Sequence, residues 1–151
     1  MSIASLLARG QRAWAATATD TCQITRTAVE GDDEYVAQVI DDDTLQYPEQ
    51  GRVTVYQGPC KVQVKVDINS NVVETTAGDR EWTYLIEQLQ LPVHTPADAT
   101  GDVSEVDADH VCEILTAPHF PGLAGAKTNI QSNYYKSQAV YRRCRVKEPV
   151  A

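Results

Sequence analysis

The sequence has no apolar run near the roughly 20 residues that a membrane-spanning helix needs. It also lacks a basic stretch followed by an apolar one, because Arg9 and Arg12 follow the short apolar segment 2–7. We therefore expect a protein with no membrane partner, made and kept in the cytosol. In that reducing compartment the four cysteines are expected to remain free thiols.

Positive charge is scarce as well. Lys and Arg total 13 against 21 Asp and Glu, which gives a formal net charge of -8. Because DNA affinity depends mainly on neutralising phosphates with Lys and Arg, this balance argues against tight DNA binding. The 151 residues suit one domain over 1–151, and a hydrophobic content of 42% is sufficient for a core.

Catalytic motifs are also missing: no G-x-S-x-G, P-loop or H-E-x-x-H string occurs. His110 and Cys112 are the nearest Cys–His pair and could share one face of a strand, so a small Cys/His hydrolase or metal-binding protein is an alternative. In the simpler interpretation, Cys112 is a core residue and His110 ends a strand. The acidic segments 41–43 and 102–109 lack the ligand spacing of a calcium loop. We expect no catalytic residue, metal site or cofactor.

Residues 1–17 predict a helix. Ser2 can cap it, and several alanines favour it. An isolated helix of this length is marginal in water, so its apolar stripe should pack against the rest of the chain or a neighbouring subunit and serve in assembly. The stripe consists of Ile3, Leu6, Leu7 and Trp14.

From residue 20 onward the hydrophobic pattern has a period of two, which is typical of strands. Gly58-Pro59 is expected to interrupt one strand, and a change of parity between Ile86 and Leu89 predicts a bulge or bend in another. We predict four well-defined strands, at 21–27, 53–66, 81–93 and 139–147, and two weaker ones, at 111–115 and 127–133.

Short strands separated by turn signals predict a mainly β fold: a small antiparallel β-barrel or sandwich over 20–148, with an N-terminal α-helix and long loops. Residues 35–40, inside the first loop, could form a further short strand. The expected loops are 29–50, 67–79, 96–109 and 118–126.

Several short sequence segments, spread over most of the chain, together carry a family resemblance. The most characteristic of them are Asp20-Thr21-Cys22 and Gly58-Pro59-Cys60. The segments comprise residues 2–10, 20–26, 55–63, 85–93, 100–103 and 143–148. In these segments the sequence resembles the small head–tail connector, or stopper, proteins of actinobacterial tailed phages, which are related to the broader head–tail joining family. Residues 29–50 and 71–78 depart from that family's pattern.

The resemblance implies a β-barrel with a helix that assembles with itself into a ring, commonly a hexamer, at the head–tail interface of the virion. The ring would join the portal and adaptor proteins to the tail terminator or tail-tube protein and help to retain packaged DNA. DNA would pass through it without specific binding. The alternatives are a tail-terminator or tail-tube ring protein, and a soluble interaction domain that forms no ring.

The loop 67–79 is far longer than a tight hairpin needs, and long loops of this kind are usually functional or disordered. In the connectors that the sequence resembles, a loop in this position closes the channel behind DNA. We expect its polar residues to bond with neighbouring copies and its valines to pack around the axis, unless it is a plain surface loop. The residues of this gate hypothesis are Asn69, Asn71, Val72, Val73, Thr75 and Thr76.

Overall fold

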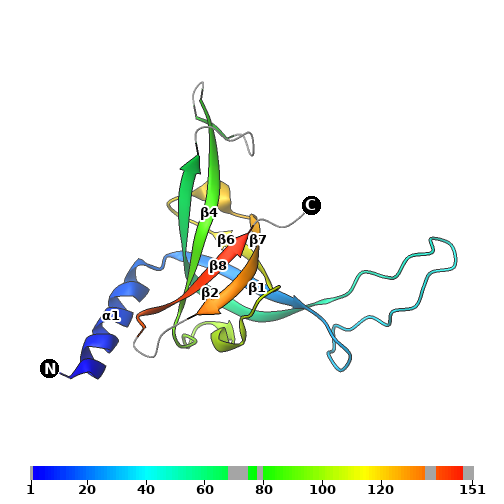
Figure 1. Ribbon diagram of the computed structural model, residues 1–151, viewed down its shortest axis with the longest axis horizontal. Helices are drawn as coiled ribbons and strands as arrows, with labels where there is room; N and C mark the ends of the chain where they lie inside the picture. The colour runs from blue at the N-terminus through cyan, green and yellow to red at the C-terminus, as the bar shows by residue number, and fades with distance from the viewer. Residues whose placement is uncertain (1, 68–74, 78–79, 135–138, 148–151) are drawn as a thin grey trace.

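The computed structural model describes residues 2–67, 75–77, 80–134 and 139–147. They form a mainly β fold, in which six antiparallel strands close into a barrel and an N-terminal helix stands beside it (Figure 1). The predicted fold class is confirmed. The elements are α1 (Ile3–Thr17), β1 (Asp20–Thr27), β2 (Arg52–Asp67), β3 (Thr75–Ala77), β4 (Arg80–Pro92), β5 (Thr100–Gly101), η1 (Val103–Glu105), β6 (Val111–Thr116), η2 (Pro121–Leu123), β7 (Lys127–Tyr134) and β8 (Tyr141–Lys147).

All six predicted strands form, and the sheet order is β3-β4-β8-β7-β6-β1-β2-β5 with an additional β4–β2 pairing. That additional pairing closes the barrel, because β2 is long enough to have two partners. Its first part runs antiparallel to β1 as far as Cys60, and its second part pairs with β4 from Lys61 onward. Where β2 changes partner, the buried carboxylate of Asp20 accepts a hydrogen bond of 3.0 Å from the backbone N–H of Val62.

The predicted interruption of β2 at Gly58-Pro59 is wrong. Both residues continue the ladder, with Gly58 opposite Cys22 on β1. A Cβ on Gly58 would lie 2.9 Å from Oη of Tyr56, so glycine is needed to let that phenol fold beneath the strand. Tyr56 Oη then donates a hydrogen bond of 2.7 Å to the carbonyl of Pro59. The missing N–H of Pro59 falls at the end of the β1 ladder, where a strand tolerates it.

The predicted bulge in β4 is confirmed. Gln63 of β2 lies opposite Gln88, but the next residue, Val64, lies opposite Ile86. Glu87 is therefore the extra residue of a β-bulge. Beyond the bulge, Leu89 and later residues of the same parity point into the barrel, where Leu89 is almost fully buried.

The interior of the barrel is filled by aliphatic side chains, one tyrosine and all four cysteines, which are free thiols. Contacts with the thiols of Cys112 and Cys60, together with burial, raise the pKa of Cys22 well above its usual value. Burial raises the pKa of Cys144 to about 12. The thiols of Cys22 and Cys144 therefore stay protonated, and all four cysteines pack as small, buried apolar groups. The fully buried side chains are Tyr56, Ile24, Leu89, Leu91, Ile114, Ile130, Val103, Cys22, Cys60, Cys112 and Cys144.

The loops differ in part from their predicted form. Residues 96–109 include β5, which pairs with β2, and the short turn η1, while 118–126 include η2. Residues 29–50 contain no regular element, so the short strand expected at 35–40 does not form. Within 67–79, residues 75–77 are not loop but the strand β3, which pairs with the start of β4.

The buried thiols generate a first prediction. The native protein should react very slowly with a thiol reagent at pH 8, because reaction needs an exposed thiolate. After unfolding in guanidinium chloride, all four cysteines should react. A count below four in the unfolded protein would contradict the free-thiol assignment, and rapid native reaction would contradict the burial.

Candidate functional site

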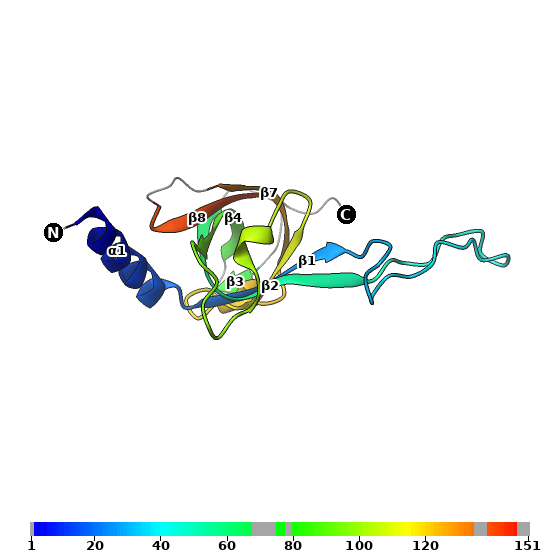
Figure 2. The same ribbon diagram turned by 90° about the horizontal axis from the view of Figure 1, so that it is seen from below.

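Two features project from opposite sides of the barrel: α1, in blue, and the segment 29–50, which runs away from the far side (Figures 1 and 2). We call the segment 29–50 the arm. Both expose apolar side chains, as described below. They are therefore the candidate functional surfaces of this chain.

The second half of α1 is fixed to the barrel through Trp14, whose side chain is 8% exposed. Its indole Nε1 donates a hydrogen bond of 2.9 Å to Oε1 of the buried Gln90 on β4. The ring also stacks on Tyr141 at the start of β8, with centroids 6.0 Å apart and planes inclined by 22°. The helix thus touches two adjacent strands through one side chain.

Two further contacts bring the middle of α1 close to the start of β8. A Cβ on Gly10 would lie 2.9 Å from Cγ2 of Val140, so the absence of a side chain allows the close approach. Gln11 Nε2 donates a hydrogen bond of 3.2 Å to the carbonyl of Ala139. Ser2 caps the N-terminus of the helix, as the sequence predicts, and its side-chain hydroxyl accepts a hydrogen bond from the backbone N–H of Ser5.

The first half of α1 is open. Ile3 is 61% exposed and Leu6 50% exposed, while Leu7 is half-buried. The predicted assembly stripe is therefore divided: Trp14 packs on its own barrel, and the residues nearer the N-terminus remain available.

An open groove of about 300 Å³ lies between α1 and the end of β4. Its walls are mostly apolar, with Arg12 on the helix side and His94 on the barrel side. Two alanines one heptad apart, Ala8 and Ala15, leave room along the helix. The residues that line it are Ala8, Gln11, Arg12, Trp14, Ala15, Pro92, Val93, His94, Pro96 and Val140. Sequence reasoning missed this groove, since segments far apart in the sequence form it.

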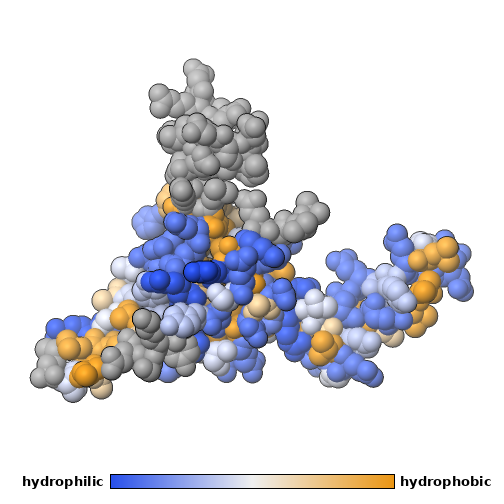
Figure 3. Space-filling view, viewed as in Figure 1, coloured by the Kyte–Doolittle hydropathy of each residue, from blue (hydrophilic) through white to orange (hydrophobic). Residues whose placement is uncertain are grey.

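The arm carries exposed apolar side chains among acidic ones, and Figure 3 shows them at its far end. Leu45 is 77% exposed and Val39 71% exposed. At the tip the chain turns through Asp41, whose N–H donates to the carbonyl of Gln46 and whose carbonyl accepts the N–H of Leu45 at 2.8 Å. Leu45 has a φ of 56°, a conformation that makes a tight reversal possible. The exposed large apolar residues of the arm are Val29, Val36, Val39, Ile40, Leu45 and Tyr47.

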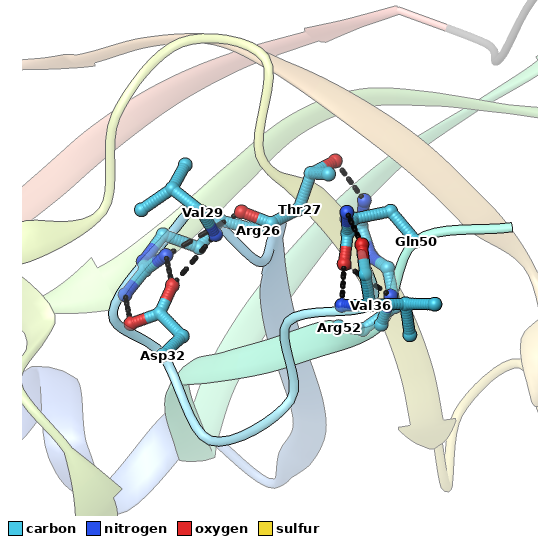
Figure 4. A network of polar contacts seen from close by, with 8 residues as sticks. Arg26, Thr27, Val29, Asp32, Val36, Gln50 and Arg52 are labelled. Atoms are coloured by element: carbon cyan, nitrogen blue, oxygen red, sulfur yellow. Dashed lines mark hydrogen bonds and ion pairs between the residues drawn. The ribbon is translucent and has the colours of Figure 1, made fainter. Parts of the chain in front are cut away.

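The base of the arm is held by a bidentate ion pair (Figure 4). Arg26, near the end of β1, donates from Nη1 to Oδ2 of Asp32 at 2.8 Å and from Nη2 to Oδ1 at 3.2 Å. The same Oδ2 accepts the N–H of Val29 at 2.8 Å. These bonds lower the pKa of Asp32 to about 2.

A second set of bonds joins the two legs of the arm where they leave the barrel (Figure 4). The side-chain amide of Gln50 pairs with both backbone groups of Val36, accepting its N–H at 2.6 Å and donating to its carbonyl at 3.0 Å. Arg52, at the start of β2, donates to the hydroxyls of Thr25 and Thr27 on β1. Side chains thus stabilise the arm's base where a strand ladder does not form.

The other sequence-predicted residues lie apart from these surfaces. Cys112 is buried in the barrel, while Nδ1 of His110 accepts the N–H of Asp107 in a turn at 3.1 Å. The thiol of Cys112 is therefore buried on β6, whereas the imidazole of His110 is hydrogen-bonded in the turn before that strand. Desolvation lowers the pKa of His110. In the described part of the chain, no three His, Cys, Asp or Glu side chains are grouped to hold a metal ion.

Most residues of the gate hypothesis lie outside the part of the chain that the structure describes. These residues are Asn69, Asn71, Val72 and Val73. Thr75 and Thr76 belong to β3, opposite Trp82 and Glu81 of β4. Across the ranges that the structure covers, no helix has the length and apolar character to cross a membrane.

The fold and its two projections define a class: a small closed antiparallel β-barrel with a docked N-terminal helix and a long acidic arm. Residues 10–147 match the family of unknown function DUF6093, and the chain belongs to that family. Neither the curated proteins nor the solved structures contain a match.

Trp14 generates a second prediction. Replacing it with alanine should lower the free energy of unfolding by about 3–5 kcal/mol, because a large buried side chain is lost. Leu6→Ala, on the exposed half of the same helix, should cost less than about 0.5 kcal/mol in the isolated chain. Urea unfolding of both variants measures the difference. Equal small effects would mean that α1 is not docked through Trp14.

Asp32 generates a third prediction. Its folded pKa lies below the unfolded value of about 4, so it stabilises the arm's base above that pH and loses this effect as pH falls through about 2. An NMR titration should show the Val29 amide and the Asp32 carboxyl changing together near pH 2. In Arg26→Gln the midpoint should rise toward about 4. An unchanged midpoint in that variant would contradict the ion pair.

Proposed function

We propose that this chain is a structural virion protein without enzymatic activity, which forms a ring at the head–tail interface of a tailed phage. The ring joins the portal and adaptor proteins to the tail and helps to retain and pass packaged DNA. The observation that carries the proposal is the placement of two projections with exposed apolar side chains on opposite sides of a closed barrel. The resemblance of the sequence to head–tail connector proteins supports it independently.

A subunit of a ring contacts one neighbour through one surface and the next neighbour through a different surface. The strands at the two ends of the sheet order are too short to provide long edges for such contacts, since β3 has three residues and β5 two. Side chains on α1 and on the arm supply two distinct surfaces instead. This arrangement fits a ring subunit better than a two-fold dimer, in which both copies use the same patch.

The acidic balance suits a channel that DNA traverses. A net charge of -8 for each copy repels the phosphate backbone, so a duplex does not adhere to the subunit. DNA then passes without specific binding.

The fourth prediction concerns the phage that encodes the chain. A nonsense mutation in its gene should yield heads that lose their packaged DNA and separate tails of normal length, which electron microscopy distinguishes from joined, DNA-filled particles. Supplying the intact gene from a plasmid should restore joining. Antibody labelling of wild-type particles should mark the head–tail junction.

Two outcomes would contradict the placement. Mutant particles that join normally would remove the role in joining. Tails of abnormal length would indicate the tail-terminator alternative, because that ring sets where tail growth stops.

A further inference from the structure

We propose that the arm of one copy of this chain docks in the groove beneath α1 of a second copy, so that successive copies join head to tail. The inference deepens the proposed function, since it rests on a ring of identical subunits and names the contact that builds it. The occupant of the groove is thus the arm of a second copy, which is an acidic segment with exposed apolar side chains toward its tip.

The first argument is apolar complementarity. Val39, Ile40, Leu45 and Tyr47 expose large apolar side chains on the distal part of the arm. Exposed clusters of this kind mark contact surfaces in soluble proteins. The groove presents an open apolar wall of alanine, proline, valine and tryptophan side chains, with a volume of about 300 Å³, which is room for one or two aliphatic side chains.

The second argument is charge complementarity. The arm contains acidic residues and neither Lys nor Arg. Conversely, α1 contains Arg9 and Arg12 and no acidic residue, and Arg12 lines the groove. Opposite potentials of this kind steer association and fix its register. The acidic residues of the arm are Glu30, Asp32, Asp33, Glu34, Asp41, Asp42, Asp43 and Glu49.

The third argument is geometric. The arm and α1 lie on opposite sides of the barrel in both perpendicular views, so the arm is directed away from the groove of its own copy (Figures 1 and 2). Two different complementary surfaces on one chain generate a heterologous contact, which closes into a ring when the rotation permits. A two-fold dimer does not follow from this arrangement.

The fourth argument is preorganisation. The Arg26–Asp32 ion pair and the Gln50–Val36 bonds hold the arm's base before any partner arrives. Ordering a free segment at the moment of binding costs free energy. An arm fixed at its base avoids part of that cost.

The test measures the mass of the purified full chain by sedimentation equilibrium over rising concentration. Leu45→Asp and Val39→Asp should each weaken self-association at least about tenfold, since each places a charge in an apolar contact. The matched control is Tyr134→Asp, which adds the same charge at a similarly exposed side chain (55%) on β7, outside the arm and the groove, and should associate as the parent does. Ala15→Trp should weaken association from the groove side, and circular dichroism verifies that it folds.

A mixing experiment tests the head-to-tail geometry. The Leu45→Asp variant keeps its groove, and the Ala15→Trp variant keeps its arm. An equimolar mixture should therefore form a dimer of one copy each and nothing larger, whereas each variant alone stays monomeric. Larger assemblies in the mixture, or no dimer, would overturn the proposed contact.

A charge exchange tests the electrostatic part. Arg9→Glu with Arg12→Glu should weaken association at low salt, and Asp42→Arg with Asp43→Arg should do the same. A mixture of the two should associate more tightly than either alone, and high salt should reduce all these differences. Absence of recovery in the mixture would overturn the pairing of arm and helix.

The outcomes separate this inference from the proposed function. If the parent stays monomeric at every concentration while the nonsense mutant still makes unjoined particles, the docking inference is wrong and the head–tail role stands. If arm variants self-associate normally but fail to bind the adaptor protein, the arm's partner is that protein and the inference is again wrong. If self-association behaves as expected but mutant particles join normally, only the head–tail role fails.

Discussion

The whole architecture depends on one strand, β2, that pairs first with β1 and then with β4. At the change of partner, Asp20 satisfies the N–H of Val62 inside the barrel wall. A buried carboxylate is tolerated only where hydrogen bonds compensate for its lost hydration, so this bond fixes the position of the closure. Because Asp20 starts β1 three residues after α1 ends, the same bond also fixes where the helix leaves the barrel.

Closing the barrel determines where the chain can interact. An open sheet would offer long edges for pairing with other chains, and closure removes them. Among the described residues, elements that leave the wall include α1 before β1 and the arm between β1 and β2 (Figure 1). Since β1 runs across the barrel wall from one end to the other, the segments at its two ends emerge on opposite sides of the barrel (Figure 1). The separation of the two projections is thus a direct consequence of one strand crossing the wall.

The sequence predicts much of the barrel because its strands alternate cleanly. The parity change between Ile86 and Leu89 even predicts the bulge at Glu87. It fails where tertiary contacts override local preference: Gly58 and Pro59 remain in β2 because Tyr56 folds against them. The strand expected at 35–40 needs a partner ladder, and there the Gln50 side chain occupies both backbone groups of Val36 instead.

The candidate site was less predictable for the same reason. Local pattern identified the apolar stripe of α1, but it could not show that the stripe divides between docked and open residues. That division follows from Trp14, whose hydrogen bond to Gln90 and stacking on Tyr141 fix one end of the helix on β4 and β8. With that end fixed, the helix leans away and leaves the groove between Ala8 or Ala15 and the end of β4. Trp14 therefore contributes both to the docking of α1 and to the wall of the groove beside it, so the stability of the helix and the shape of the groove are coupled.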